Sequence, residues 1–454
     1  MSVRESINLA LDETPVTPNR RRMWALASAG IGLSGYDFFI MSAALPLIQA
    51  NFGTFSPTIA GFFAAAAFLG AVPGAIISGV LSDRYGRRLI LLIDVALLTI
   101  TSILCAIAWS PFILIFFRFL QGISVGAEYP ISASLVGEIM PRKSRGKWMT
   151  GAFSFQAIGM TLAAAICSII LLINPSEQSW RWMLLSCAVP ALILAVLRTS
   201  IRESPRWLAR KGRLKEAKDS LFWLIGAHIL PVSKKKEEEP QKSHLKELFR
   251  KEFRMRTIFT AVPWFLMDIA LYGIGLFTPM ILVYLLHPTA IHTSGFIAAD
   301  FRADMMTVIA DIFLIFGFAL NIFFVERRGR VQLQILGFIG MAIGTGLIGI
   351  FGMRTGDLAL ILGFSIFNLM VNFGPNATTF LLPVEVFPTR LRATGHGFAA
   401  ACGKTGATFG VFFLPMAFHA LGLRTTMISV GILCLIGAMI TVVARVETKG
   451  LALE

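Results

Sequence analysis

The chain has 454 residues, of which 56% are hydrophobic and only 15% are charged, and its formal net charge is +15. A soluble domain is about half apolar and about one quarter charged, so the shortage of charge indicates a membrane protein and excludes an ordinary soluble one. The basic excess would favour a nucleic-acid-binding protein if the chain were soluble, but the positions of the basic residues follow membrane topology instead, so no nucleic-acid partner is expected.

Long apolar runs separate the charges, and each run is long enough to cross a bilayer, which takes about 20 residues. The chain is predicted to be an all-α polytopic membrane protein with a segment 1–22, a first set of six helices in 23–200, a linker 201–256, a second set of six in 257–445 and a tail 446–454. The predicted transmembrane helices are 23–50, 57–81, 89–109, 111–139, 147–173, 181–200, 257–286, 305–325, 331–353, 357–386, 392–420 and 425–445.

Basic clusters recur on one side of the predicted membrane. The segments "NRRR", "DRYGRR", "PRKSRGK", the linker, "ERRGR" and "PTRLR" all fall on the same side, whereas the other side has only scattered arginines. The positive-inside rule then predicts a multi-pass protein of the cell (cytoplasmic or inner) membrane with both termini in the cytoplasm. No cleavable signal peptide is evident, because the N-terminus is polar and the first apolar run is too long.

The five cysteines, Cys105, Cys167, Cys187, Cys402 and Cys434, all fall inside predicted membrane helices. This placement predicts buried free thiols and no disulfide or metal site. No nucleophile-elbow, metal or phosphate-loop motif occurs, so neither an enzyme nor a cofactor is expected.

The linker has two parts. The stretch "SPRWLARKGRLKEAKDSLFWLI" has amphipathic helical spacing and begins with Ser204 and Pro205, a plausible cap and first-turn pair. It could lie along the membrane face or serve as an ordinary connector, and these alternatives have equal weight. The following "KKKEEEPQK" is a solvated charge run.

The two halves of the chain repeat one another. "DRYGRR" (83–88) after the second predicted helix matches "ERRGR" (326–330) after the eighth, and "GEIMPRKSRG" (137–146) matches "VEVFPTRLRA" (384–393) after the fourth and tenth. These matching positions predict two pseudo-symmetric six-helix bundles, related by an axis along the membrane normal.

Polar residues inside the apolar runs are the candidates for function, because burying a charge in a bilayer is costly. We expect Asp94, Asp311 and Asn372 to make structural bonds between helices. The remaining residues recur at mid-depth in helices that would line a cavity between the bundles: Asp37, Arg118, Glu128, Gln156, Asp268, Asn376 and Lys404. In "PWFLMDIALYG", Trp264, Asp268 and Tyr272 are spaced by four residues and therefore share one helix face.

"GVLSDRYGRRLIL", its degenerate copy and the number of helices resemble the major facilitator superfamily. "RESPRWL" and "VETKG" are similar to motifs of its sugar-porter and phosphate-porter branches, with departures at Arg202 and Val446. The resemblance implies two rocking bundles and a gating role for Asp83, Arg84, Gly86, Arg87, Glu138, Arg145, Glu326, Arg330, Glu385 and Arg392.

Three further stretches resemble proton-coupled phosphate symporters: "GAEYPISASLVGE", "PWFLMDIALYGIGL" and "NFGPNATTFLLPVEVFPTRLRATGHGFAAACGKTGA". Sugar porters would have glutamines where this chain has Trp264 and Asp268. The resemblance implies a phosphate site formed by Tyr129, Gln156, Trp264, Asp268, Tyr272, Asn376 and Lys404, with Asp37, Glu128 and Asp268 carrying protons. Glu128 replaces the usual aspartate, which leaves the substrate open.

The chemistry of these side chains suits a phosphate anion. Hydroxyls, the indole N–H and amides match oxygens that both donate and accept, and Lys404 supplies positive charge. Asp268 would repel the anion unless it holds a proton, which would couple substrate to proton. We therefore expect a monomeric proton-coupled importer of inorganic phosphate working by alternating access in a lipid bilayer. The alternatives are a symporter for another small solute, such as an organic anion or a sugar, and a non-transporting nutrient sensor.

Overall fold

The computed structural model describes residues 3–53, 57–226, 245–286, 296–351, 357–446 and 448, and within these ranges the chain is helical without any strand. The predicted charge run and most of the predicted tail lie outside the described residues. The helices of the first half are α1 (Val3–Glu13), α2 (Pro18–Phe52), α3 (Pro57–Tyr85), α4 (Arg87–Ala106), α5 (Pro111–Ile139), α6 (Arg145–Ile173), α7 (Ser179–Ser186) and α8 (Ala188–Arg198).

Two short helices follow in the linker, α9 (Pro205–Arg210) and α10 (Leu214–Ile225). The helices of the second half are α11 (Lys251–Leu286), α13 (Phe296–Arg328), α14 (Arg330–Phe351), α15 (Asp357–Phe373), α16 (Pro375–Val386) and α17 (Arg392–Val443). Short 3-10 turns occupy Arg142–Ser144 and Leu245–Phe249.

Eleven segments in the described part are long and apolar enough to cross a membrane. The side chains of residues 296–310, at the start of α13, lie outside the described residues, and α13 occupies the place of the predicted eighth span in the chain order. The chain is therefore a multi-pass membrane protein, and α13 completes the twelve-helix arrangement that the sequence predicts.

Local sequence explains where several helices begin. Thr17, Ser110 and Ser204 each accept a backbone N–H from the third residue of the helix that follows, and each is followed directly by a proline. Proline fits the first helical turn because its missing N–H has no partner there in any case. The predicted cap at Ser204 is thereby confirmed.

Two membrane spans are interrupted, and the last two spans are joined directly by a bend. The sixth span bends at Cys187 between α7 and α8, and the tenth breaks at Gly374, which precedes Pro375. The last two predicted helices are both present and share the label α17, and they meet at a sharp bend at Gly422, where φ is 76° and ψ is 167°. Only glycine adopts this backbone conformation readily, so Gly422 allows the chain to reverse without a loop.

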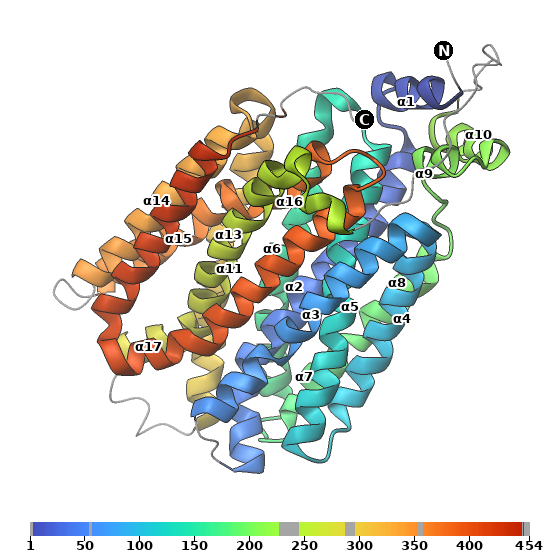
Figure 1. Ribbon diagram of the computed structural model, residues 1–454. Coiled ribbons are helices and arrows are strands. Elements are labelled where there is room, and N and C mark those ends of the chain that lie inside the picture. Colours follow the sequence, from blue (N-terminus) through green and yellow to red (C-terminus); the bar gives the residue numbers. More distant parts are fainter. Residues whose placement is uncertain are drawn as a thin grey trace.

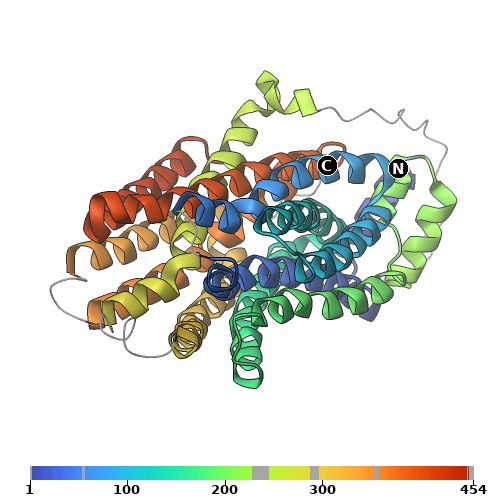
Figure 2. The same ribbon diagram turned by 90° about the horizontal axis from the view of Figure 1, so that it is seen from below.

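The helices form two groups that lie side by side. Seen from below, most of the second half of the chain, yellow to red, lies on one side, and most of the first half, blue to green, lies on the other (Figure 2). Contacts between the groups are made chiefly by α3 with α17 and by α6 with α13. At the α3–α17 crossing, a Cβ on Gly79 would lie 2.5 Å from the carbonyl oxygen of Ala393, so only glycine permits this approach.

One end of the molecule carries most of the basic side chains, and we call it the basic end. The helices α1, α9 and α10 lie there, as does the end of α17 (Figure 1). The outward faces of α4 and α8 instead expose large apolar side chains, including Ile93, Ile100 and Leu192. Such surfaces suit contact with lipid tails.

The five cysteines are free thiols, as predicted. Four of them are buried, and Cys402 is partly buried.

Candidate functional site

Seven side chains that the sequence predicts as substrate ligands come together between the two bundles. Tyr129 lies on α5, Gln156 on α6, Asn376 on α16 and Lys404 on α17, while Trp264, Asp268 and Tyr272 lie on α11. Each of them is at most 3% exposed. The first half supplies two of the seven and the second half five, so the cluster spans the interface about which the bundles would rock.

Hydrogen bonds connect the cluster across the interface. The Nε2 atom of Gln156 donates to the hydroxyl oxygens of Tyr129 and Tyr272, at 2.9 and 2.8 Å. The Nδ2 atom of Asn376 donates to Oε1 of Gln156 at 3.3 Å. Gln156 is therefore the central contact of the first half with both α11 and α16.

Lys404 is the only cation among the seven, and it is held from several sides. Its ammonium lies 3.1 Å from Oδ2 of Asp268 and donates to the hydroxyl of Tyr272 at 3.0 Å. It also lies over the rings of Tyr129, Tyr272 and Phe38, at 4.7, 4.3 and 5.3 Å from their centroids. Aromatic faces attract cations, so the position of the ammonium is determined by rings as well as by the carboxylate.

Trp264 is fixed by its own neighbours. It lies four residues before Asp268 on α11, on the same helix face. Its ring meets the imidazole of His396 edge to face at 5.4 Å, and His396 is bound to the carbonyl oxygen of Phe380 at 3.1 Å. The buried His396 therefore supports Trp264, a role that sequence reasoning did not identify.

Stacked phenylalanines close the cluster on both sides. Phe38 on α2 stacks on Phe68 on α3 at 4.2 Å, and both rings contact Tyr272. Toward the basic end, Phe153 on α6 stacks on Phe380 on α16 at 4.2 Å, and Phe153 also contacts Tyr129. The site is thus enclosed by aromatic rings, as in an occluded state.

Asn372 belongs to the same network, whereas the sequence favoured a purely structural role. Its side-chain oxygen accepts from Asn376 at 2.7 Å, and its Nδ2 atom donates to the carbonyl oxygen of Leu314 on α13 at 3.0 Å. The spacing of four residues between the two asparagines was a signal for this contact.

The two other predicted proton carriers lie outside this cluster, within the first half. Asp37 on α2 forms an ion pair with Arg118 on α5 at 2.8 Å, and Arg118 also binds the backbone carbonyl of Asp37. Both side chains are buried.

Glu128 precedes Tyr129 on α5, but its carboxylate is directed to a different set of partners. The guanidinium of Arg198, at the end of α8, binds both of its oxygens, at 2.8 and 2.7 Å. Oδ2 of Asp94 on α4 lies 3.7 Å from the Nη1 atom of Arg198, the same atom that binds Oε2 of Glu128. Sequence reasoning did not single out Arg198 and therefore missed the partner of Glu128.

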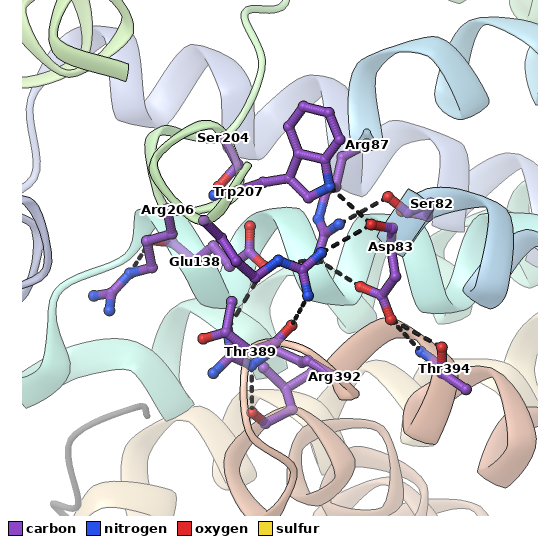
Figure 3. Close-up of polar contacts among 12 residues, drawn as sticks. Ser82, Asp83, Arg87, Glu138, Ser204, Arg206, Trp207, Thr389, Arg392 and Thr394 are labelled. Atoms are coloured by element: carbon purple, nitrogen blue, oxygen red, sulfur yellow. Dashed lines mark hydrogen bonds and ion pairs between the residues drawn. The ribbon is translucent and has the colours of Figure 1, made fainter. Parts of the chain in front are cut away.

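The predicted gating residues of the first half form a latch at the basic end (Figure 3). Arg87 binds Asp83 at 3.0 Å and Glu138 at 2.8 Å. The other oxygen of Asp83 accepts the backbone N–H and the hydroxyl of Thr394 on α17, both at 2.9 Å. Asp83 therefore connects the two bundles directly.

A second cross-bundle contact lies beside it. Arg392, at the start of α17, is 3.6 Å from Glu138 on α5. By pseudo-symmetry Arg145 would approach Glu385, but its Nη2 atom instead binds Asp12 of α1 at 2.6 Å. Asp12 also binds Arg206 at 2.7 Å, so α1 takes part in the arrangement of the basic end, which the sequence did not indicate.

The second half has its own version of the latch. Arg330 binds Glu326 and Glu385, both at 2.8 Å, and Glu385 also accepts from the hydroxyl of Thr448. The backbone N–H of Lys147 on α6 donates to Glu326 at 3.2 Å, which again joins the halves.

The remaining predicted gating residues play smaller parts. Arg84 is exposed and lies over the ring of Tyr85 at 5.2 Å, so it takes no part in the contacts between the bundles that are described above. Gly86 has a φ of 107°, and a Cβ there would lie 2.3 Å from the carboxylate of Glu203. The Glu203 carboxylate accepts the backbone N–H groups of Arg87 and Arg88 at 3.0 and 3.1 Å, and it thus caps α4. Burial raises the pKa of Glu203 above its usual value despite the nearby Arg87.

Among the described residues, no group of three or more His, Cys, Asp or Glu side chains lies close enough together to hold a metal ion.

Comparison with known proteins agrees with this architecture. The profile of the family described as "Sugar (and other) transporter" matches residues 23–454. The low affinity inorganic phosphate transporter 1 of Petunia hybrida is 28% identical over 490 aligned positions, which cover 95% of this chain and 91% of that protein. The inner membrane metabolite transport protein YgcS of Escherichia coli (strain K12) is 30% identical over 424 aligned positions, which cover 93% of this chain and 89% of that protein.

Solved structures show the same fold. The proton:xylose symporter XylE of the major facilitator superfamily, bound to 6-bromo-6-deoxy-D-glucose, matches with a TM-score of 0.77 and 20% identity, over 96% of this chain and 97% of that one. The chain therefore belongs to the sugar (and other) transporter family of the major facilitator superfamily, whose members are membrane transporters and not enzymes.

Proposed function

We propose that the protein imports inorganic phosphate together with protons, by alternating access of a central site to the two sides of the cell membrane. The basic end faces the cytoplasm in this proposal, in accordance with the positive-inside rule. The observation that carries the proposal is the buried contact of 3.1 Å between Lys404 and Asp268, inside a ring of hydroxyl and amide groups from both bundles.

Charge balance links the anion to a proton. The ammonium of Lys404 and the carboxylate of Asp268 neutralise one another in the closed site. An entering anion would compete with Asp268 for Lys404 and leave an uncompensated negative charge in a buried place, which is strongly unfavourable. A proton on Asp268 removes the competitor and restores neutrality, so one anion and one proton bind more favourably together than either does alone.

The remaining groups suit a phosphate oxygen shell. The hydroxyls of Tyr129 and Tyr272 can donate or accept, and the amides of Gln156 and Asn376 offer N–H groups. In the closed site these groups bind one another instead. A ligand would replace these bonds with its own, and all the groups belong to one chain, so a monomer suffices.

Relatives support phosphate without establishing it. The Petunia protein, which is named an inorganic phosphate transporter, is 28% identical to this chain. A sugar is the second candidate, because the paired Lys404 and Asp268 make the closed site neutral and hydroxyls with amides also suit a neutral polyol.

The test is uptake of radiolabelled phosphate into proteoliposomes with and without an inward proton gradient. We expect the gradient to increase uptake by the unaltered protein, and Asp268→Asn to make uptake equal in both conditions, because an amide is neutral at every pH. Asp311→Asn is the matched control, since Asp311 is a buried acid of α13 outside the cluster. Unaltered protein that takes up phosphate equally well without the gradient would contradict proton coupling.

A competition panel separates the two candidate substrates. Excess unlabelled phosphate should block the uptake of labelled phosphate, and excess xylose should leave it unchanged. Uptake of labelled xylose that phosphate does not inhibit would favour the sugar.

A further inference from the structure

A second cluster of buried charges lies in the first bundle, beside the central site. It consists of Asp94 on α4, Glu128 on α5 and Arg198 at the end of α8, each at most 5% exposed. Glu128 and the site residue Tyr129 are consecutive on α5, so this cluster and the substrate site are neighbours on one helix. Neither the gating latch nor the phosphate site uses Asp94 or Arg198.

The charges in this cluster do not balance. Asp37 has Arg118, and Asp268 has Lys404, but Asp94 and Glu128 share the single cation Arg198. Two buried carboxylates with one guanidinium leave one negative charge without a partner, which a protein interior avoids by binding a proton.

The geometry indicates which of the two acids carries the proton. Glu128 is bound by Arg198 through both oxygens, at 2.8 and 2.7 Å, and also accepts from Ser132. Bidentate binding of this kind strongly favours the ionised carboxylate. Asp94 is 3.7 Å from Arg198, beyond hydrogen-bond distance, and its Oδ1 atom accepts from the hydroxyl of Ser124 at 2.8 Å.

Asp94 lies at a packed junction of three helices. Residues of α2, α4 and α5 form this junction, among them Gly30, Ser34, Asp94, Ser124 and Glu128. A Cβ on Gly30 would lie 2.0 Å from Arg198 and 2.3 Å from Glu128, so glycine leaves the room that the ion pair occupies. The ionisable groups that face Asp94 are Glu128 from α5 and Arg198 from α8, and the α2 residues of the junction carry no charge.

We propose that Asp94 is a second proton-binding carboxyl of the transport cycle, with Arg198 holding Glu128 as its ionised neighbour. The step is a protonation alone: an O–H bond forms on the Asp94 carboxylate when the site faces one side, and the proton returns to water on the other. This inference rests on the proposed function, in which Asp268 supplies one proton for each phosphate monoanion. A second proton makes the cycle carry one net positive charge inward.

Dependence on membrane potential separates this inference from the proposed function. An inside-negative potential of about 100 mV raises the limiting accumulation by about fifty-fold for one net charge and leaves a neutral cycle unchanged. The experiment measures uptake of labelled phosphate into proteoliposomes with the proton gradient and the potential imposed separately. We expect the unaltered protein to respond to both, and Asp94→Asn to keep the response to the proton gradient but lose the response to the potential.

Asp311→Asn is the control, because it neutralises a buried acid outside both clusters, and it should behave as the unaltered protein does. An unaltered protein that responds to the proton gradient but not to the potential overturns the second proton and leaves the proposed function intact. Absence of any response to the proton gradient overturns the proposed function and this inference with it. If Asp94→Asn responds to the potential as the unaltered protein does, Asp94 is not the carrier.

Asp94→Glu decides the result if Asp94→Asn is inactive. Uptake by Asp94→Glu that responds to the potential supports the proposal, because the carboxyl is restored. If Asp94→Glu is inactive, or if its uptake does not respond to the potential, the proposal is overturned.

Discussion

At the scale of single residues, the hydroxyl of Tyr272 is the contact through which the two charged groups of the site reach the first bundle. It accepts from the ammonium of Lys404 at 3.0 Å and from the amide of Gln156 at 2.8 Å. The hydroxyl of Tyr129 accepts from the amide of Gln156 at 2.9 Å, whereas Lys404 lies over its ring. A neutral hydrogen bond contributes about 1 kcal/mol and one to a charged group about 1.5–3 kcal/mol. Removing the hydroxyl of Tyr272 should therefore cost more binding free energy than removing the hydroxyl of Tyr129.

Removing each hydroxyl tests this difference. We expect Tyr272→Phe to weaken phosphate binding by about tenfold or more and Tyr129→Phe by about fivefold, because only the first change also releases Lys404. Calorimetric titration of the purified variants with phosphate provides the measurement. Equal losses, or a larger loss for Tyr129→Phe, would show that the contact with Lys404 does not determine the role of Tyr272.

The face shared by Trp264, Asp268 and Tyr272 was predictable because spacing by four residues is a property of any helix. The bond between Asp268 and Lys404 was not, since 136 residues separate the two in the chain. For the same reason the sequence could not assign Arg198 to Glu128, which lies 70 residues away. A charged residue within an apolar run shows that a partner is needed, but only the packing of helices selects which one.

At the scale of elements, glycine and proline determine where the membrane helices bend. The tenth span breaks at Gly374, just before the site residue Asn376, and α17 reverses at Gly422. The two helices that the sequence predicted at 392–420 and 425–445 are both present, and they join at Gly422 without a loop, because this glycine adopts a region of φ and ψ that other residues avoid.

Two glycines with equal free space around them isolate the effect of the backbone. A Cβ on Gly422 or on Gly346, which lies within α14, would meet no atom within 4 Å. Gly422→Ala should destabilise the protein by about 1–3 kcal/mol, because alanine does not tolerate the bend. Gly346→Ala should stabilise it by about 0.5–1 kcal/mol, because glycine weakens a helix interior.

Thermal unfolding of both variants in detergent gives the comparison, and the midpoints should move in opposite directions. A fall in the midpoint for Gly346→Ala, or no change for Gly422→Ala, would show that contacts rather than backbone conformation control these positions.

At the scale of the whole molecule, the closed basic end depends on bonds that cross between the bundles. Asp83 reaches Thr394, Arg392 approaches Glu138, and Thr150 donates to Asn321 on α13 at 3.0 Å. In the proposed alternating-access cycle these contacts would break when the basic end opens, so their strength would help to set the balance between the two states.

Thr394→Val tests the contribution of one such bond while keeping the shape of the side chain. Losing a hydrogen bond to the Asp83 carboxylate should favour the open basic end by about 1.5–3 kcal/mol, which is a shift in population of about ten- to a hundredfold. Distances between spin labels at the exposed positions 84 and 328 would report it. Thr394→Ser keeps the hydroxyl and should leave the distances unchanged, and an unchanged distribution for Thr394→Val would contradict a role in the latch.

The sequence by itself determined the membrane class, the chain order of the helices, the repeat of the two halves and most of the side chains that meet at the centre. These properties follow from local composition, from helical spacing and from motifs that recur within one chain. The tertiary structure decided which charges pair: Asp268 with Lys404, Asp37 with Arg118, and Glu128 with Arg198, which leaves Asp94 as the acid without a cation of its own. Pairing depends on distances of a few ångströms between helices far apart in the chain, and the free energy of a buried charge depends on that partner more than on its own identity.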